Sequence, residues 1–420
     1  MKKVAIIHYA FTPVVGGVEF VIEQHAALFA RNGYEVRVIC GEGKSNDDGV
    51  VLHLIDELCA AHPDVVSSQS AINQGLPDSP AFVQLKEKLT RVLADALQDI
   101  DIVFVHNVLT MHFNLAATAA IWELADQLPN VRFVNWIHDL APLNPAYDLP
   151  QIDTAPTNLI VQNHPAIDPI AISRRRKFEY CQIVGMYPED CPVIPNGVEV
   201  MKLLELTEPV ADLVRRVAIL SRDIVLIQPS RILRRKNIEC GIRVLDALRQ
   251  QGHSAVYLVT GAADPHYPAA AEYGQELHAM VKDRGLERDF IFVGEHFLVS
   301  DQDLVSLYNV SDALFMPSKQ EGFGLPLLEA GFFRLPAFCP GIEPMMSILE
   351  NNVFLFELED DPIDIAKLVA DTLESSRGHK SRKETLLKYS WERLLRKYLE
   401  PLFLSDQSDN REAQDQATST

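Results

Sequence analysis

The sequence predicts an α/β fold of two Rossmann-like domains, each built on a parallel β-sheet. Short, continuous apolar runs alternate with helix-length amphipathic segments along almost the whole chain. This alternation starts again near residue 200 and so divides the chain into two halves of similar size. The length of 420 residues is enough for two or three domains. Continuous apolar strands separated by helices indicate a parallel sheet that is covered on both faces.

The individual elements follow from apolar runs, helical spacing and turn residues. In the first half we expect strands at 4–8, 35–40, 51–55, 102–106, 131–137 and 158–162, and helices at 18–32, 81–97, 112–128 and 171–184. In the second half we expect strands at 192–195, 224–228, 255–260, 290–293, 313–316, 336–339 and 354–356. The helices expected there are 200–220, 237–251, 270–284, 304–309, 325–333, 364–375 and 391–404.

These elements predict one domain over residues 1–200 and a second over 201–385. The polar tail at 405–420 is expected to be disordered. Because ligands of open parallel sheets bind beyond the carboxyl ends of the strands, we expect the two sheets to face a central cleft that holds the site.

Composition excludes several classes of protein. The formal net charge of −20 argues against a nucleic-acid-binding protein, although a local cationic pocket could still bind a small phosphate compound. The six cysteines form no closely spaced pair and suit a reducing cytoplasm. No apolar run is long enough for a transmembrane segment. An N-terminal signal peptide is disfavoured because His8 and Glu19 interrupt the apolar pattern.

The first candidate site is the loop that joins the first strand to the first helix. Gly16 and Gly17 would let backbone N–H groups approach a ligand closely, and the start of the helix adds partial positive charge. The loop is not G-x-G-x-x-G, so a dinucleotide fingerprint is absent. A plain flexible turn is the alternative interpretation.

The second candidate lies at the carboxyl ends of two apolar strands. His138 could donate a hydrogen bond to a substrate hydroxyl, and Asp139 could orient it or accept one from the ligand. His106 and Asn107 end the preceding strand and would line the same crevice. A helix-capping aspartate beside a core histidine is the alternative.

The third candidate is a cluster of four cations within six residues, after one strand and before a helix. Arg231 and Lys236 are the expected phosphate ligands, while Arg234 and Arg235 are expected to be solvated. An exposed basic turn is the alternative. A second basic run at 174–177 is expected to be a solvated helix face, with a membrane or acceptor contact as its alternative.

The fourth and most specific candidate is a glycine-rich turn between a strand and a helix. Gly322 and Gly324 permit a tight turn, and the N–H groups of Phe323, Gly324 and Leu325 would point at an anion. Two carboxylates flank this turn, Glu321 before the helix and Glu329 eight residues later. A glutamate can accept from adjacent sugar hydroxyls. The alternative for Glu329 is a partly exposed helix residue.

With these motifs in this order, the chain resembles the family 4 retaining glycosyltransferases of the GT-B fold. The resemblance covers about residues 1–404 and is most specific at Glu321-Gly-Phe-Gly-Leu-Pro-Leu-Leu-Glu329. It implies transfer of a hexose from a nucleotide-diphosphate sugar, with UDP-glucose or GDP-mannose as the leading donors. It also implies an acceptor-binding domain at 1–200, a donor-binding domain at 201–385 and a last helix at 386–404 that crosses back onto the first domain.

The resemblance also implies residue roles. Arg231 and Lys236 would neutralise the donor diphosphate, which Gly16 and Gly17 would approach from the first domain. Glu329 would bind the ribose. The donor sugar would contact Glu321, His138 and the turn residues Gly322, Phe323, Gly324 and Leu325. The base would lie near Gly294 and Phe297. The assigned catalytic set is His138, Asp139, Glu321, Arg231 and Lys236, and the acceptor set is His106, Asn107 and His138.

No metal and no further cofactor is expected, because the cations would stabilise the leaving diphosphate. The acceptor is left open as a sugar, another small molecule or a lipid-linked compound. The expected location is the cytoplasm, with peripheral attachment to the inner face of the membrane as a second option. A sugar-nucleotide epimerase and a non-catalytic nucleotide-sugar-binding scaffold are the alternative functions.

Overall fold

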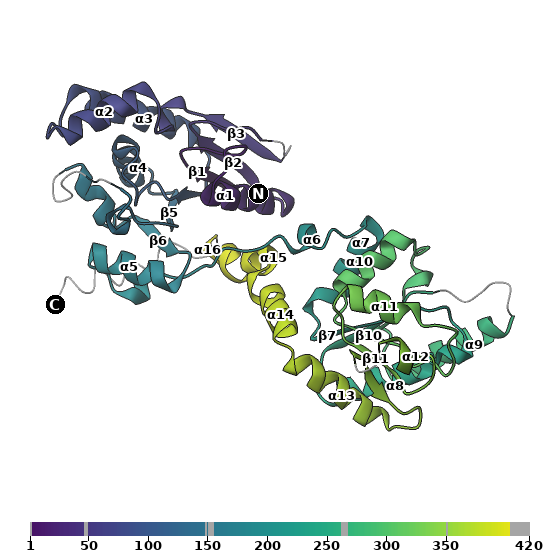
Figure 1. The fold of residues 1–420 in the computed structure, drawn as a ribbon. Coiled ribbons are helices and arrows are strands. Elements are labelled where there is room, and N and C mark those ends of the chain that lie inside the picture. Colours follow the sequence, from purple (N-terminus) through teal and green to yellow (C-terminus); the bar gives the residue numbers. More distant parts are fainter. Residues whose placement is uncertain are drawn as a thin grey trace, which may run out of the picture. The chain divides into compact units, whose positions relative to one another are not determined.

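The computed structural model describes residues 2–45, 49–147, 149, 155–261, 268–349 and 352–403. The chain forms two compact domains (Figure 1). The N-terminal domain comprises Met1–Gly197 and Trp391–Thr420, and the C-terminal domain comprises Val198–Ser390. The predicted boundary at residue 200 lies three residues from this division. The tail at 405–420 lies outside the described residues.

The N-terminal domain contains a six-stranded parallel sheet of order β3-β2-β1-β4-β5-β6. Its strands are β1 (Lys3–Ile7), β2 (Glu35–Cys40), β3 (Val50–Leu54), β4 (Ile102–His106), β5 (Arg132–Ile137) and β6 (Ile167–Ala171). Its helices are α1 (Gly17–Arg31), α2 (Pro63–Asn73), α3 (Pro80–Ala96), α4 (Leu115–Gln127) and α5 (Arg174–Val184).

The C-terminal domain repeats this plan with the parallel sheet β12-β11-β10-β7-β8-β9. Its strands are β7 (Ile224–Gln228), β8 (Ala255–Val259), β9 (Phe290–Phe292), β10 (Ala313–Phe315), β11 (Ala337–Pro340) and β12 (Phe354–Phe356). Its helices are α6 (Val200–Leu203), α7 (Glu208–Val217), α8 (Ile238–Gln250), α9 (Pro268–Asp283), α10 (Asp301–Val310), α11 (Leu325–Phe332), α12 (Met345–Ile348), α13 (Pro362–Ser375) and α14 (Arg377–Tyr389).

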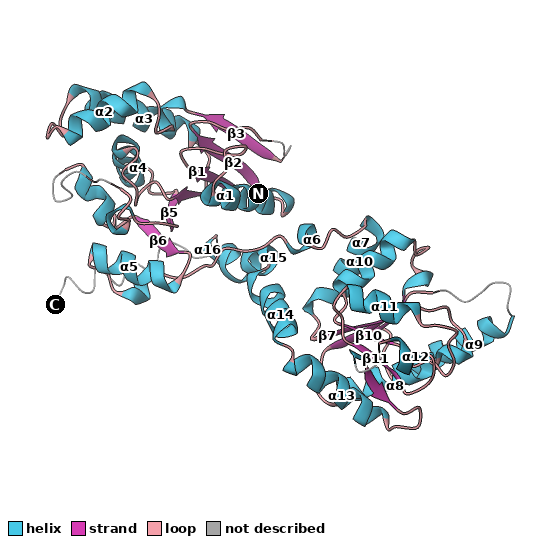
Figure 2. Ribbon diagram, viewed as in Figure 1, coloured by secondary structure: helices cyan, strands magenta, loops and turns pink. Residues whose placement is uncertain are grey.

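Helices flank the strands in both domains (Figure 2), and central strands such as β4 and β7 are buried along their whole length. Successive strand residues point to opposite faces. In β1, Ala5 and Ile7 therefore join the core beneath α3 and α4, whereas Val4 and Ile6 join the core beneath α1. The two sheets confirm the predicted α/β class with two Rossmann-like domains. That these sheets face a common cleft stays a prediction.

The chain returns to the N-terminal domain after α14. The returning segment consists of α15 (Trp391–Leu394), a π-helical turn (Leu395–Leu399) and α16 (Glu400–Leu402). Trp391, Leu395 and Leu399 are buried in the same core as Val4 and Ile6. At the crossing point, a side chain on Gly197 would collide with the Trp391 ring at 2.5 Å. The return therefore requires glycine at this position.

Several predicted elements were wrong. The strand expected at 158–162 is a 3-10 helix (Thr157–Val161), and the sixth strand is β6. Pro169 argues against a strand in the sequence, but it is tolerated because β6 is an edge strand. Val193 forms only an isolated bridge to Ala171, so no strand occupies 192–195. The helix expected at 200–220 is divided into α6 and α7, and neither α2 nor α14 was expected.

Within the described residues, none of the helices combines the length and the apolar character needed to cross a membrane.

Candidate functional site

The basic segment of the C-terminal domain lies between β7 and α8. Its last residues form a 3-10 helix (Arg234–Lys236). The Lys236 ammonium forms an ion pair with Glu321, which is 85 residues away in sequence. Only 13% of the Lys236 side chain and 8% of the Glu321 side chain are exposed. The two residues meet because β7 and β10 are neighbours, so the segments after their carboxyl ends share one edge of the sheet.

Glu321 also contacts a second cation. Arg235 Nη1 lies 3.4 Å from Glu321 Oε2 and donates to the Gln320 carbonyl oxygen at 3.2 Å. Burial raises the pKa of Glu321, but Lys236, Ser318 and Arg235 together outweigh this effect and leave the pKa below its usual value. Glu321 is therefore ionised at neutral pH. An anionic ligand at this edge would share Lys236 with the Glu321 carboxylate.

Two buried polar side chains fix the backbone of Lys236 by hydrogen bonds. The side-chain amide of Gln228 donates to the Lys236 carbonyl oxygen at 2.8 Å, and the Tyr257 hydroxyl donates to Gln228 Oε1 at 2.8 Å. Gln228 and Tyr257 have no exposed surface. This chain of hydrogen bonds fixes the backbone of the basic segment before any ligand arrives, which is the preorganisation that electrostatic catalysis requires.

The other arginines of the segment are exposed. Arg234 forms two hydrogen bonds to Glu276, at 2.6 and 2.9 Å, and stacks over the Tyr273 ring. These surface contacts fit the expectation that Arg234 is not a ligand.

The loop that carries Arg231 packs against Gly261, where an added Cβ would lie 2.4 Å from the Ser230 carbonyl oxygen. Gly261 was not singled out from the sequence, and it sets the path of this loop.

The glycine-rich turn follows β10, as predicted, and α11 begins at Leu325. Gly324 caps this helix with φ of +102°, a conformation that favours glycine. A Cβ atom added at Gly322 would have no neighbour within 4 Å, and Phe323 and Leu325 are exposed. The turn therefore leaves its backbone accessible.

The two residues predicted to lie near the base follow β9. Gly294 lies in a 3-10 turn (Val293–Glu295), and Phe297 is partly buried against the domain core.

Glu329 lies one turn inside α11 and is held by a residue that the sequence analysis did not identify. The Tyr308 hydroxyl, on α10, donates to Glu329 Oε2 at 2.7 Å. Burial and the hydrogen bond to Glu329 raise the pKa of Tyr308. The Tyr308 ring stacks on Phe333 at a centroid distance of 4.9 Å. The carboxylate of Glu329 is therefore fixed in direction while one of its oxygens remains available.

The predicted role of Glu329 in binding a nucleotide-sugar donor can be tested with Tyr308→Phe, which is expected to weaken that binding about threefold to tenfold because one hydrogen bond that orients Glu329 is lost while the ring packing is kept. Calorimetric titration of the nucleotide sugar would measure the change. An unchanged dissociation constant in a folded variant would show that Tyr308 does not orient a ligand-binding carboxylate.

In the N-terminal domain, three histidines end three neighbouring strands. His8 follows β1, His106 ends β4 and His138 follows β5, and the sheet order places these strands side by side. His8 Nδ1 lies 2.7 Å from the His106 carbonyl oxygen, and His106 Nδ1 lies 3.0 Å from His138 Nε2. His106 has no exposed surface, whereas 8% of His138 is exposed. His106 was predicted to contact the acceptor directly. The structure instead places it behind His138.

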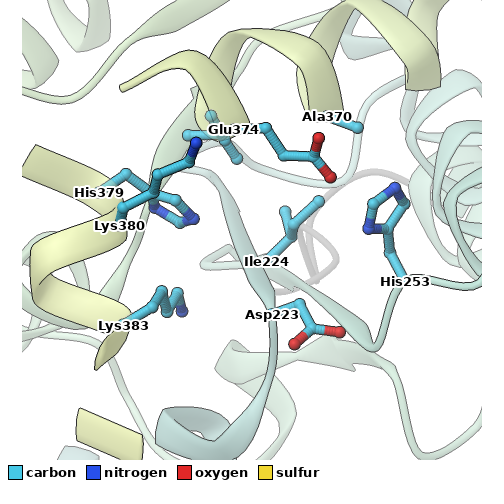
Figure 3. A pocket seen from close by; sticks show the side chains of 9 residues that line it. Asp223, Ile224, His253, Ala370, Glu374, His379, Lys380 and Lys383 are labelled. Atoms are coloured by element: carbon cyan, nitrogen blue, oxygen red, sulfur yellow. The ribbon is translucent and has the colours of Figure 1, made fainter. Parts of the chain in front are cut away.

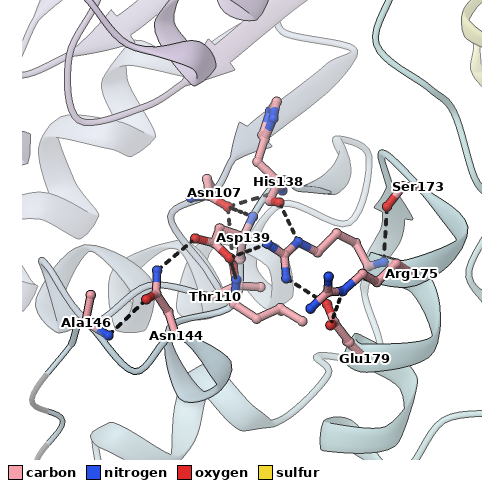
Figure 4. A network of polar contacts seen from close by, with 11 residues as sticks. Asn107, Thr110, His138, Asp139, Asn144, Ala146, Ser173, Arg175 and Glu179 are labelled. Atoms are coloured by element: carbon pink, nitrogen blue, oxygen red, sulfur yellow. Dashed lines mark hydrogen bonds and ion pairs between the residues drawn. The ribbon is translucent and has the colours of Figure 1, made fainter.

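Asn107 and Asp139 form the polar network that holds the end of β5 (Figure 4). Asn107 Oδ1 accepts hydrogen bonds from the backbone N–H groups of His138, at 3.2 Å, and Asp139, at 2.7 Å. The Asp139 carboxylate accepts from the Leu140 N–H at 2.9 Å and pairs with Arg176 at 2.8 Å. Asn107 and Asp139 therefore position His138, and their side-chain oxygens are engaged within the domain.

Arg176 corrects the expectation of a solvated basic face at 174–177. Its guanidinium is partly buried and bonds to Asp139, to the His138 carbonyl oxygen at 3.1 Å and to Glu179 at 2.7 Å. Arg174 and Arg175 are exposed, as expected. The sequence alone does not separate Arg176 from its exposed neighbours, because the position of each arginine on α5 decides which one faces the strand ends.

A fourth histidine lies deeper in the same core. His25 has no exposed surface and makes edge contacts with His106, Trp136 and Trp391 at centroid distances of 4.7–5.2 Å. Among the described residues, neither of its ring nitrogens has a hydrogen-bond partner. Burial lowers the pKa values of His25 and His138 to about 3 and also lowers that of His106. All three rings are therefore neutral at pH 7.

A separate cavity of about 280 Å³ opens near the amino end of β7 (Figure 3). Asp223, His253, Glu374, His379 and Lys383 contribute to its lining. The predicted donor residues follow the carboxyl end of the same strand, so this cavity is not their site. Beside it, Lys383 pairs with the buried Asp312 at 2.6 Å and ties α14 to the C-terminal domain.

Two parallel-sheet, Rossmann-like domains with polar residues at the carboxyl ends of their strands are the architecture of the GT-B fold. The model for "Glycosyltransferase Family 4" matches residues 15–202, and that for "Glycosyl transferases group 1" matches residues 212–386. The chain belongs to the glycosyltransferases that combine a family 4 N-terminal domain with a group 1 C-terminal domain.

Two relatives and one solved structure illustrate the similarity. Mannosylglucosylglycerate synthase of Thermotoga maritima is 26% identical, over 95% of this chain and 92% of that protein. Serotype-specific mannosyltransferase WbdA of Escherichia coli is 44% identical over 75 residues, which are 18% of this chain and 9% of that protein. The structure of sucrose-phosphate synthase from Thermosynechococcus elongatus is 18% identical, covers 97% of this chain and 100% of that chain, and has a TM-score of 0.38.

Proposed function

We propose that this enzyme transfers a mannosyl group from GDP-mannose to a hydroxyl of a small polar acceptor, with retention of the anomeric configuration. Of the two donors favoured from the sequence, GDP-mannose has the better support because both relatives above are named for mannosyl chemistry. The name of the relative that matches over most of the chain favours a glucosylglycerate-like acceptor. UDP-glucose remains the alternative donor.

The observation that carries this proposal is the Lys236–Glu321 pair at the carboxyl ends of β7 and β10. It places a cation for a phosphate and a carboxylate for sugar hydroxyls in direct contact, as the junction between a diphosphate and its sugar requires. In this proposal Arg231 and the open backbone of Gly17 also approach the diphosphate. Glu329 binds the ribose, and the base lies near Gly294 and Phe297.

The proposed reaction takes place on one face of the donor sugar. The bond between C1 and the phosphate oxygen breaks, and its electron pair goes to the leaving diphosphate, where Lys236 and Arg231 stabilise the charge. The acceptor oxygen forms the new bond to C1 and gives its proton to the leaving phosphate. His138 contacts the donor sugar near C1. Asp139 is poorly suited to be a covalent nucleophile, because Arg176 and the Leu140 N–H already engage its carboxylate.

We place this reaction in the cytoplasm, since all six cysteines are free thiols, which suits a reducing compartment. A lipid-linked acceptor with peripheral membrane attachment is the second option. The cations of the basic segment allow the reaction to proceed without a bound metal ion in this proposal.

The test is a matrix of donors and acceptors. Purified enzyme would be incubated with GDP-mannose, UDP-glucose or ADP-glucose, each with glucosylglycerate, mannose or no acceptor, and nucleotide release would be measured. We expect GDP release that depends on glucosylglycerate. Faster release from UDP-glucose would overturn the donor assignment. Release without any acceptor would favour the epimerase alternative, and tight donor binding without acceptor-dependent release would favour the non-catalytic alternative.

A further inference from the structure

The carboxylate of Glu19 lies beside the glycine loop of the N-terminal domain. Glu19 is in the first turn of α1, and its side chain folds back over Gly16. A Cβ atom at Gly16 would lie 2.0 Å from Glu19 Oε2, whereas a Cβ at Gly17 would have no neighbour within 4 Å. The φ of Gly16 is −160°, so space and not backbone conformation requires glycine there. The two glycines therefore differ, and Gly16 makes room for Glu19.

His8 holds this carboxylate at the edge of the sheet. His8 Nε2 lies 3.6 Å from Glu19 Oε1. Because a carbonyl oxygen only accepts hydrogen bonds, the contact of His8 Nδ1 with the His106 carbonyl oxygen requires the proton on Nδ1 and turns Nε2 toward Glu19. When Nε2 also carries a proton, the contact with His8 lowers the pKa of Glu19 more than burial raises it, and Glu19 is ionised.

Glu19 shares this edge with His138. His8 and His138 follow the ends of β1 and β5, which flank β4, and His106 at the end of β4 contacts both of them, at 2.7 Å and 3.0 Å. The Glu19 side chain keeps 18% of its surface exposed, compared with 6% for His8. A carboxylate offers about four acceptor positions. His8 faces Oε1 and the backbone N–H of Glu19 also bonds to the carboxylate, so acceptor capacity remains for a ligand beside His138.

We propose that Glu19 binds a hydroxyl group of the acceptor sugar next to His138. A diphosphate is a poor partner for this position, because a phosphate that approached the Gly16 N–H would meet the Glu19 carboxylate. A neutral hydroxyl donor avoids that repulsion and forms a charge-assisted hydrogen bond. Gly17, which has open space, keeps the phosphate role alone. This inference rests on the proposed function and assigns a residue for acceptor recognition.

The test separates acceptor binding from donor binding. Glu19→Gln keeps the size of the side chain and removes its charge, and Glu23→Gln, one turn further along α1, is the matched control. The acceptor KM would be measured with glucosylglycerate at saturating GDP-mannose, and the GDP-mannose Kd by calorimetry. We expect Glu19→Gln to raise the acceptor KM about tenfold to a hundredfold and to leave the donor Kd within about twofold. Glu23→Gln should change neither value.

The inference would be overturned if Glu19→Gln left the acceptor KM unchanged, or if it raised the GDP-mannose Kd and not the acceptor KM. Either result would leave the proposed mannosyl transfer intact. Absence of transfer by the wild-type enzyme would instead overturn the proposed function and this inference with it. Circular dichroism and thermal melting would establish that each variant is folded. Glu19→Asp is the second variant, which keeps the charge, and it is expected to recover part of the lost acceptor affinity.

Discussion

Replacing Lys236 with alanine is expected to lower kcat about a hundredfold to a thousandfold while the protein remains folded. Lys236 is the cation that pairs with Glu321, and its position is fixed by the buried Gln228 and Tyr257. In the proposed reaction, its charge stabilises the leaving diphosphate more strongly in the transition state than in the bound donor. Its removal should therefore affect kcat and kcat/KM together.

The matched control for Lys236→Ala is Arg234→Ala. Arg234 is two residues away and equally cationic, but its side chain is 60% exposed and pairs with Glu276 at the surface. Its removal should change kcat by less than about threefold, since surface ion pairs contribute little. Steady-state kinetics on both variants would measure the difference. Near-normal turnover of folded Lys236→Ala would show that Lys236 has no catalytic role.

Acid is expected to destabilise the N-terminal domain steeply below about pH 6.5. His25, His106 and His138 have folded-state pKa values far below the unfolded value of about 6.5, so the unfolded chain binds these protons first. Their contribution to stability is complete above pH 6.5 and is lost as the pH falls toward 3. For each pH unit below 6.5, each of these histidines lowers the free energy of unfolding by roughly 1.4 kcal/mol, so the three together lower it by about 4 kcal/mol.

Tryptophan fluorescence can follow this loss, because Trp122, Trp136 and Trp391 are the three tryptophans of the chain and all lie in the N-terminal domain. Urea unfolding would be measured between pH 7.5 and 5. His25→Phe should reduce the pH slope by about one third and keep the fold, since His25 makes aromatic contacts and forms no hydrogen bond among the described residues. His278→Gln is the exposed control. A flat profile, or an unchanged slope in His25→Phe, would contradict the neutral histidine cluster.

The sequence predicted the fold where a local pattern carries the information. Continuous apolar runs identified most strands, because a strand in a doubly covered sheet is apolar on both faces. β6 was missed because Pro169 argues against a strand unless its edge position is known. α14 was missed because its sequence, Arg377–Tyr389, is mostly polar, and its contacts with the rest of the C-terminal domain include those of His379, Arg382 and Lys383.

The site was predictable as a set of strand-end motifs but not as a set of contacts. Lys236 and Glu321 are 85 residues apart, and only the strand order brings them together. His8 and Glu19 were seen in the sequence as interruptions of an apolar pattern. The same signal that drew attention to His106 and His138, a histidine directly after an apolar strand, also applies to His8. Positioning residues such as Arg176 and Tyr308 left no local signal, since their partners are set by tertiary packing.

The sharpest test of retaining mannosyl transfer is the anomeric configuration of the product. The enzyme would be supplied with GDP-α-mannose and glucosylglycerate, and the coupling at the new glycosidic carbon would be recorded by nuclear magnetic resonance as the product forms. We predict an α-linked mannosyl product that accumulates only when the acceptor is present. A β-linked product, or a mannosyl group trapped covalently on Glu321 or Asp139, would contradict the proposed same-face reaction.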